Sequence, residues 1–260
     1  MHAVIDSNDR RTPGAPTPRR LSASAPPPPH PVEPLRAMRG IRALLKDPDD
    51  TTQVFEIVDA LSGNVGERLF QRFVESDTGR RILEERRSLL AALDDRASLE
   101  SLPEGTLGRI YADFTARERI TGQGLVEASQ AARRRDDLDP DRRLFYERLR
   151  DMHDLWHVVT GYGRDLIGEA SLLAFTYAQT RNRGIGFIVA VAYLRARGEA
   201  LGARGLMRNA YRRGKRAKWM PGEDWEELLR LPLETVRRRL ELDAPPAYTP
   251  LRSEGAPALA

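Results

Sequence analysis

The chain has 260 residues, a net charge of +4 and no cysteine. The absence of cysteine excludes disulfides, thiolate metal sites and cysteine nucleophiles, so any metal would be bound by imidazole and oxygen. The longest apolar run, residues 184–194, has 11 residues and is too short to span a bilayer. No N-terminal apolar run has the length of a secretory signal.

The composition divides the chain into two tails and one central region. Residues 1–34 are rich in Pro, Ser, Ala and Arg, which predicts a disordered Pro-rich N-terminal tail. Residues 35–243 show helical periodicity without period-2 alternation, which predicts a single compact all-α domain of many helices. We expect residues 244–260 to form a disordered C-terminal tail.

The expected helices follow one another closely along the central region. Acidic residues and Thr before an apolar face predict a helix that starts near Thr51 and ends before Gly63. Pro232 falls in the first turn of the last helix, where its missing N–H costs nothing. The other helices are expected near residues 65–75, 78–93, 104–117, 123–135, 140–160, 164–181, 184–198, 222–230 and 232–240.

One short stretch, HDLWHVVTGYGRDLIGE (residues 153–169), holds two of the four histidines. Its helix carries an apolar stripe that begins at Phe145 and reaches Val159, in steps of three and four residues. His153 and His157 are four residues apart, so their rings stack one turn apart beside that stripe, a spacing that can bind one metal ion. Asp154 is close enough to join them or to orient one of them. Two ordinary, partly buried histidines, one of them paired with Asp154, are the alternative.

Glu169 favours the interpretation of these residues as a metal site. It is the only acidic or basic residue between Leu166 and Thr180, and an unpaired carboxylate in apolar surroundings is costly. Arg164 and Arg181 are not at helix-pair spacings from it. Gly161 and Gly163 predict a tight turn between antiparallel helices, which would bring Glu169 to the histidines. Two imidazoles with carboxylates suit zinc, or iron(II) or manganese where coordination positions stay open.

Two known classes of metal hydrolase fit this pattern poorly. A zinc peptidase would have Glu where Asp154 stands, because Asp reaches a metal-bound water less easily. A histidine-aspartate phosphohydrolase needs a further upstream His, and here only His2 and His30 are available, both in the N-terminal tail.

The pattern H-D-x-x-H, eleven residues, E resembles the signature of the Coq-four family of ubiquinone biosynthesis proteins. It is filled by His153, Asp154, His157 and Glu169. The segments DPDDTTQVFEIVDALSGN and DWEELLRLPLETVRRRL also resemble that family, so the resemblance covers about residues 35–243. It implies an all-helical protein with a bound metal, taken to be Zn²⁺ with Fe²⁺ as the alternative, on these four residues.

The resemblance further implies a lyase that removes the ring carboxylate of a polyprenylated 4-hydroxybenzoate intermediate. Our hypothesis is that His153, His157 and Glu169 hold the metal, while Asp154 is a fourth ligand or the proton shuttle. We count Asp154, His153 and His157 as catalytic. An oxidative version would need a redox metal and oxygen. A non-catalytic isoprenoid-lipid-binding scaffold for the ubiquinone biosynthetic complex is the rival interpretation, and a paralogue acting on another isoprenoid is a third.

Expectations about location and partners follow from the lipid substrate. We expect a cytoplasmic protein, peripheral on the inner face of the inner membrane of a bacterium. Its partners would be the polyprenylated hydroxybenzoate, other ubiquinone biosynthesis enzymes and an anionic membrane surface, without nucleic acid; a homodimer is left open.

Two segments are candidates for lipid contact. Apolar residues that could line a tunnel for the isoprenoid tail, or simply fill the core, are Leu172, Leu173, Phe175, Phe187, Ile188 and Val189. A basic stretch without acidic residues predicts a helix on anionic lipid; a solvated Arg-rich face is the alternative, and nucleic-acid binding is a third option. Its residues are Arg204, Arg208, Arg212, Arg213, Lys215, Arg216 and Lys218, interleaved with Leu206, Met207, Tyr211 and Trp219.

Overall fold

The computed structural model describes residues 31–48, 50–120, 138–197 and 201–251. These residues form helices and no strand, with one isolated bridge between Thr106 and Pro232. The all-α prediction is therefore confirmed for the described part of the chain. No helix within it is long and apolar enough to cross a membrane.

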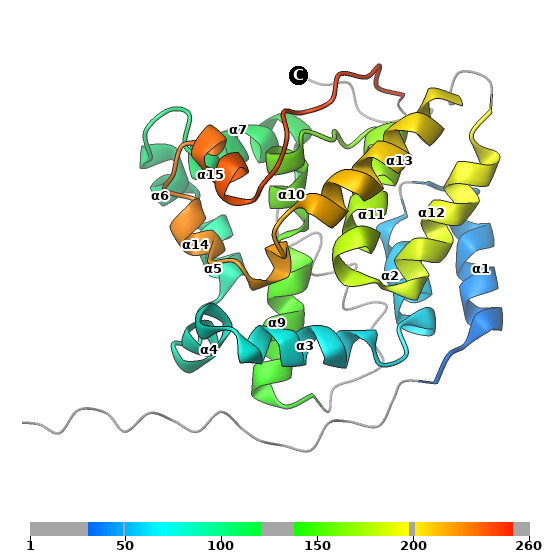
Figure 1. The fold of residues 1–260 in the computed structure, drawn as a ribbon, viewed down its shortest axis with the longest axis horizontal. Coiled ribbons are helices and arrows are strands. Elements are labelled where there is room, and N and C mark those ends of the chain that lie inside the picture. Colours follow the sequence, from blue (N-terminus) through cyan, green and yellow to red (C-terminus); the bar gives the residue numbers. More distant parts are fainter. Residues whose placement is uncertain (1–30, 49, 121–137, 198–200, 252–260) are drawn as a thin grey trace, which may run out of the picture.

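Figure 1 shows the helices in chain order, and the labels used below are those of the figure. The first group is α1 (Pro34–Leu44), α2 (Thr51–Leu61), α3 (Val65–Glu75), α4 (Asp77–Glu84), α5 (Leu89–Asp94), α6 (Arg96–Ser101) and α7 (Leu107–Glu118). The second group is α9 (Pro140–Asp151), α10 (His153–Thr160), α11 (Leu166–Thr180), α12 (Arg183–Arg195), α13 (Leu201–Arg216), α14 (Trp225–Leu228) and α15 (Leu233–Arg239).

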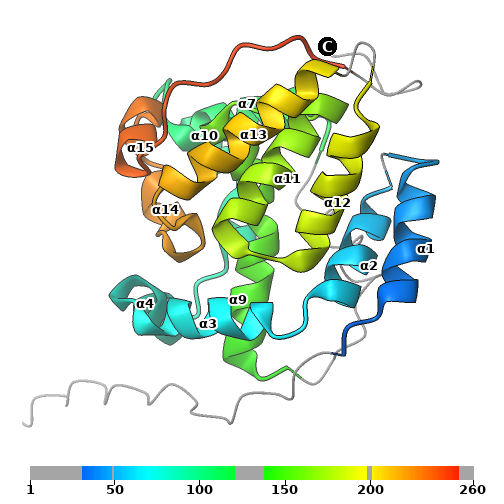
Figure 2. The same ribbon diagram turned by 45° about the vertical axis from the view of Figure 1, so that its right-hand side comes forward.

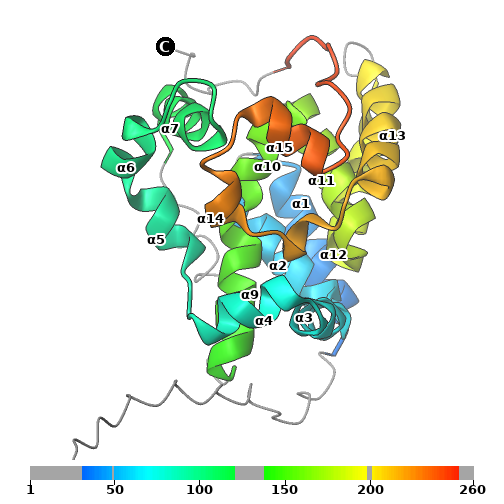
Figure 3. The same cartoon turned by 60° about the vertical axis from the view of Figure 1, so that its left-hand side comes forward.

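Helices α9 and α10 run through the middle of the molecule and separate two sides (Figure 3). On one side α7 and α15 pack against α10, and α5 packs against α9. On the other side α13 lies along α11, and α12 packs against both α11 and α2. Helix α1 packs on α2 at the outer edge of this second side (Figure 2). Helix α10 therefore lies between the two sides, in contact with α11 of the second side.

Three clusters of buried side chains form the core, and the largest one reaches both sides. The largest cluster of buried side chains lies around α10, α11 and α15 and includes Trp156, Phe175 and Trp225. A second cluster joins α3 and α4 to α9 around Phe73 and Phe145. A third and smaller cluster holds α1, α2 and α12 together. The apolar stripe predicted for the histidine helix is buried at four of its five positions: Phe145, Met152, Trp156 and Val159.

Several predicted helices differ from the observed ones. The single helix expected over 140–160 is interrupted at Met152, where ψ is −6° instead of the helical value of about −42°. The helix expected over 78–93 is broken at Arg86, which adopts a positive φ of 53°. The helix expected from residue 164 begins at Leu166, because Asp165 caps it. The helix expected at 123–135 lies outside the described residues.

The boundaries of the tails also differ. Residues 1–30 of the predicted N-terminal tail lie outside the described residues, and α1 begins at Pro34, one residue before the predicted domain. The described part of the predicted C-terminal tail, residues 244–251, is bonded to the domain: Leu166 N–H donates to the carbonyl of Leu251 at 2.8 Å. Through Tyr248 and Leu251 this segment has hydrogen-bond partners on the α10–α11 turn.

Candidate metal centre

The turn between α10 and α11 is shaped by glycine. Gly161 ends α10 in the left-handed region, with a φ of 79°, and its N–H donates to the carbonyl of His157. A Cβ on Gly161 would also lie only 2.4 Å from the side chain of Pro245. Both the backbone conformation and the close approach therefore require glycine at this position.

Asp165 starts α11 and sets the position of Glu169. Its carboxylate accepts hydrogen bonds from the backbone N–H groups of Ile167 and Gly168, as an N-cap residue does. Its carbonyl accepts the N–H of Glu169 at 2.8 Å. Glu169 consequently lies in the first turn of α11, next to the histidines of α10.

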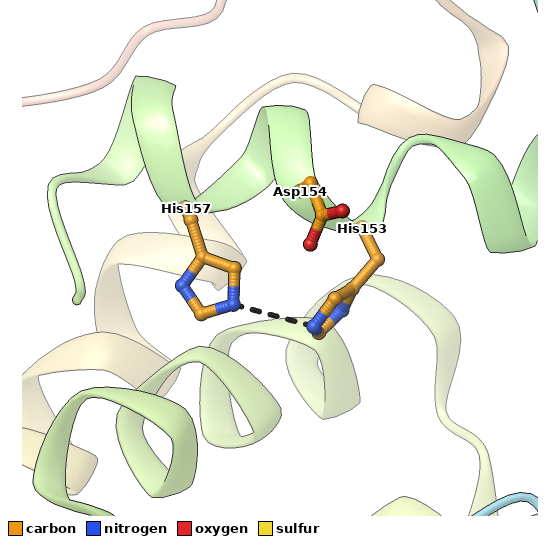
Figure 4. A group of neighbouring side chains, drawn as sticks. All are labelled: His153, Asp154 and His157. Atoms are coloured by element: carbon orange, nitrogen blue, oxygen red, sulfur yellow. Dashed lines mark hydrogen bonds between the residues drawn. The ribbon is translucent and has the colours of Figure 1, made fainter. Parts of the chain in front are cut away.

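The two imidazoles and the carboxylate meet at one point. Nε2 of His157 lies 3.3 Å from Nε2 of His153 (Figure 4). It also lies 3.4 Å from Oε1 of Glu169, while Nε2 of His153 lies 3.8 Å from Oε2. Asp154 offers a ligand atom within 4.8 Å of ligand atoms of both rings, and Figure 4 shows its carboxylate pointing toward the same space. The structure thus brings together all four predicted residues.

The ring of His157 is held in one orientation. Its Nδ1 lies 2.8 Å from the carbonyl oxygen of Tyr162, so Nδ1 carries the proton and donates it. Phe114 of α7 stacks on the same ring, with centroids 6.0 Å apart. In the neutral ring the lone pair of Nε2 then faces the carboxylate of Glu169. Two acceptors at 3.4 Å repel each other unless a proton or a metal cation lies between them.

The pKa values of Glu169 and His157 are shifted in the directions that favour positive charge beside the carboxylate. Burial by itself would raise the pKa of Glu169, but the two imidazoles and Arg164 outweigh it and lower the pKa to about 2. Burial works against protonation of His157, yet the carboxylate of Glu169 raises its pKa. Burial and the neighbouring His157 lower the pKa of His153. The raised pKa of His157 shows that the carboxylate of Glu169 favours positive charge at this position.

The donor atoms fit a metal ion of the predicted kind. Zinc–ligand distances of about 2.0–2.2 Å in a tetrahedron place neighbouring ligand atoms about 3.3–3.6 Å apart. Two of the three spacings, 3.3 and 3.4 Å, match this value, and the third is 3.8 Å. The carbonyl behind His157 is the usual outer partner of a metal-binding imidazole. His153, His157 and Glu169 could hold the ion, with Asp154 next to them.

The surroundings of Glu169 differ in one respect from the sequence prediction. Its side chain is 34% exposed, and Nε of Arg164 lies 3.8 Å from Oε1. The helix-pair rule excluded Arg164, but this residue precedes α11 and belongs to the turn, where that spacing rule does not apply. The carboxylate is therefore less isolated than expected, although the contact with Arg164 is too long for a hydrogen bond.

The C-terminal segment supplies a residue that sequence reasoning missed. The hydroxyl of Tyr248 donates to Oδ2 of Asp165 at 2.6 Å and accepts the N–H of Gly163 at 2.8 Å. Leu251 N–H donates to Oδ1 of Asp165 at 3.0 Å. These bonds pin the turn before Glu169. A signal for the Asp165 cap was present just before Leu166, whereas nothing in the sequence connects Tyr248 with residues more than 80 positions earlier.

Two acidic or phenolic groups near Asp154 were also missed. Burial, together with the charge of Asp154, raises the pKa of Tyr111, so this phenol stays protonated. Burial raises the pKa of Asp151 to about 6, and Arg150 partly offsets the rise. Both are buried: Tyr111 lies on α7, which packs against α10, and Asp151 is the last residue of α9.

The residues predicted for lipid contact differ in their exposure. Of the six apolar candidates, Leu172, Phe175 and Ile188 are buried in the core, and the other three are half-buried. Among the basic residues Arg213 is buried; it donates to the carbonyl oxygens of Thr160 and Asp243. Arg213 thus connects α13 to the end of α10 and to the C-terminal segment, and it is not part of an exposed surface.

Comparisons with known proteins identify the family of this chain. A family profile described as coenzyme Q (ubiquinone) biosynthesis protein Coq4 matches residues 33–246. A mitochondrial ubiquinone biosynthesis protein of Neurospora crassa is 32% identical over 186 residues, which cover 71% of this chain and 52% of that protein. The mitochondrial counterpart from Schizosaccharomyces japonicus is 30% identical, with 70% of this chain and 75% of that protein covered. The chain therefore spans about half the length of the first relative and three quarters of the second.

A solved structure has the same fold. A protein of Nostoc punctiforme, provisionally described as a ubiquinone biosynthesis protein, superimposes with a TM-score of 0.60 at 22% identity. The alignment covers 80% of this chain and 97% of that one. From the profile match and the identities to curated relatives, the chain belongs to the Coq4 family of coenzyme Q (ubiquinone) biosynthesis proteins.

Proposed function

We propose that this protein is a metal-dependent decarboxylase that acts on a polyprenylated 4-hydroxybenzoate intermediate of ubiquinone biosynthesis. The observation that carries the proposal is the convergence of three donor atoms, on His153, His157 and Glu169, at spacings of 3.3–3.8 Å. An ordinary hydrogen-bonded cluster would be shorter. Family membership supports a role in ubiquinone biosynthesis, and the three donor atoms support a metal-dependent reaction.

His153, His157 and Glu169 would hold the metal, with Zn²⁺ as the first choice and Fe²⁺ as the second. When bound, the ion supplies a Lewis acid that can bind and orient the ring carboxylate of the substrate. The chain fixes the geometry around it. The carbonyl of Tyr162 and the ring of Phe114 hold His157 in place, while the Asp165 cap holds Glu169.

The reaction itself requires one proton at the ring carbon that loses its carboxylate. The bond between this carbon and the carboxylate breaks, carbon dioxide leaves, and the electron pair is taken up by the new C–H bond. The phenol oxygen para to this carbon can donate electron density during protonation. Asp154 is buried and points into the same space as the histidines, so it is our choice for the group that moves the proton.

The substrate determines the expected location and partners. A polyprenyl tail keeps the substrate in a bilayer, so the protein would work as a peripheral protein on the inner face of the inner membrane of a bacterial cell. The other enzymes of the pathway would be its neighbours there, because each intermediate stays in the same membrane.

The decisive experiment combines elemental analysis with turnover of a prenylated 4-hydroxybenzoate by the purified full chain. We expect one metal per site and release of carbon dioxide. Carbon dioxide without oxygen uptake identifies simple decarboxylation, and stoichiometric oxygen uptake identifies the oxidative version. Intact metal content and turnover in His157→Ala would contradict the proposal. His30→Ala, which removes an imidazole outside the family match, is the matched control.

A non-catalytic lipid-binding scaffold remains the competing function. It predicts that ligand variants keep their association with the other biosynthetic enzymes and that the purified chain releases no carbon dioxide. Measuring both properties on the same His157→Ala preparation separates the two functions.

A further inference from the structure

We propose that the outer face of α1 is the surface through which this protein docks on an anionic lipid bilayer. The outer face is defined by Leu35, Met38, Arg39, Arg42, Leu45 and Lys46, all exposed. Docking gives the proposed function its access to a lipid substrate, but the evidence for this face does not depend on the metal or the reaction.

Exposed apolar side chains concentrate at this helix. Among the described residues, five large apolar side chains are exposed, and four of them belong to α1 or its flanks: Val32, Leu35, Met38 and Leu45. Leu35 has the highest exposure, at 76%. Elsewhere in the described chain only Leu194 is comparable. A single exposed leucine is ordinary, but a group on one short helix marks an interaction surface.

The opposite side of α1 is fully engaged with the protein. Ala37 and Ile41 are buried in the small core shared with α2 and α12. Arg36 donates to Glu56 and Asp59 of α2 at distances near 2.5 Å. The exposed apolar residues are therefore not a loosely packed side of the helix. They form a second apolar face on α1, a helix that lies at the edge of the molecule in Figure 2.

Three cations lie among these apolar residues without acidic partners. At 100° per residue, Leu35, Met38, Arg39 and Arg42 fall within about 100° of the helix surface. Within the described residues, Arg39, Arg42 and Lys46 make no ion pair, whereas Arg36 on the inner side binds two carboxylates. The outer face thus offers positive charge and apolar surface side by side.

Helix α13 shows why positive charge alone does not identify the surface. Arg208 and Arg212 are exposed there, as the sequence predicted. The apolar side of the same helix is buried against α11, with Met207 at 2% and Ala210 at 0% exposure. Among the described residues of α13 no large apolar side chain is exposed beside these charges, whereas the α1 outer face carries both.

An anionic bilayer is the occupant that satisfies both properties. It places negative headgroups directly above an apolar layer, which matches arginines flanked by Leu and Met on one helix face. A nucleic acid would pair with the cations but leave Leu35 and Met38 in water. A second copy of the chain, related by a twofold axis through this face, would bring the same three cations against one another.

Co-sedimentation of the full chain with vesicles tests the proposal without substrate or metal. We expect the wild type to sediment with phosphatidylcholine vesicles that contain phosphatidylglycerol, and much less with phosphatidylcholine alone. Arg39→Gln combined with Arg42→Gln should weaken binding about tenfold to thirtyfold, since each cation near an anionic surface contributes about fivefold. Leu35→Gln combined with Met38→Gln should weaken binding by a similar factor.

Arg208→Gln combined with Arg212→Gln removes the same two charges from α13 and is the matched control. We expect it to bind like the wild type, and circular dichroism should show that all variants fold. The proposal is overturned if both α1 variants bind normally, or if only the α13 variant loses binding. A dimer that disappears in the α1 variants while vesicle binding persists would assign the face to a second copy. Because no turnover is measured, failure here leaves the decarboxylase proposal standing.

Discussion

Two kinds of buried polar cluster occur in this protein, and they differ in their distances. In the first, a guanidinium meets a carboxylate directly: Arg148 donates to Glu226 at 2.8 Å, and Arg142 donates to Glu67 at 2.7 and 2.8 Å. In the second, His153, His157 and Glu169 approach one another only to 3.3–3.8 Å. The first kind is closed by its own hydrogen bonds, and the second leaves room for one more atom.

This difference in distance distinguishes ion pairs that stabilise the fold from a candidate metal site. Each carboxylate of the first kind has found its counterion within the chain, so its charge is used to join helices, as Arg148 of α9 joins Glu226 of α14. At the second cluster the nearest guanidinium, on Arg164, stays 3.8 Å away. The lone pairs of these nitrogen and oxygen atoms point toward one another, and not every one of them has a hydrogen-bond donor. This is the arrangement expected of residues that bind a metal.

The largest expected effect comes from breaking a pair of the first kind. Arg148→Met should lower the free energy of unfolding by about 3–5 kcal/mol, because it leaves the charge of Glu226 partly buried without its partner. Denaturant titration measures the loss. The double variant Arg148→Met and Glu226→Leu should recover most of it. If the double variant is no more stable than the single one, this cluster is not the self-contained pair that we describe.

Glu169→Gln tests the second kind in the same way. We expect metal affinity to fall about a hundredfold, equal to about 2.7 kcal/mol, with little loss of stability in the metal-free protein. Competition with a chelator measures the affinity. Glu100→Gln, which removes a carboxylate from an exposed pair with Arg96, is the control and should bind metal normally. A metal-free variant that loses several kcal/mol of stability would class Glu169 with the structural pairs.

The periodicity of the sequence predicted the helical fold and the core of the site. His153 and His157 are four residues apart on a helix with a buried stripe, so their rings had to be neighbours. The glycines of the turn then placed Glu169 opposite them. Interruptions such as Met152 were not predictable, because they depend on how α9 and α10 pack and not on the residues at the break.

Long-range partners could not be predicted. The bond between Tyr248 and Asp165 spans 83 residues, and its segment has the composition of a tail. The basic stretch shows the same limit: Arg212 and Arg213 are adjacent, yet Arg212 is exposed and Arg213 is buried beside Tyr162. Which of them faces the end of α10 depends on the register of α13 in the fold, which the pattern of charges does not contain.

Tyr248→Phe concerns both kinds of cluster. It removes the hydrogen bonds from Tyr248 to Asp165 and Gly163, and these bonds hold the turn that precedes Glu169. Losing the bonds to Asp165 and Gly163 should cost about 1–2 kcal/mol of stability. Metal affinity should fall about tenfold as the cap before Glu169 loosens. Thermal unfolding and a Co²⁺ titration measure the two effects. Tyr193→Phe is the control, and equal losses in both variants would contradict a specific role for Tyr248.

The smallest effect is the pH dependence of a structural pair. Burial would raise the pKa of Asp224, but hydrogen bonds from Arg87, the N–H of Glu227 and Arg81 outweigh it and lower the pKa below its ordinary value. A lowered carboxyl pKa stabilises the fold above the unfolded value of about 3.8, and this contribution is lost as the pH falls through the folded value. Asp224→Asn keeps an N-cap for α14 but removes the charge. The wild type should therefore lose more stability than this variant between pH 5 and pH 2 in urea titrations. Parallel losses in the two proteins would show that the charge of Asp224 contributes nothing, and that even the closed pairs serve geometry more than energy.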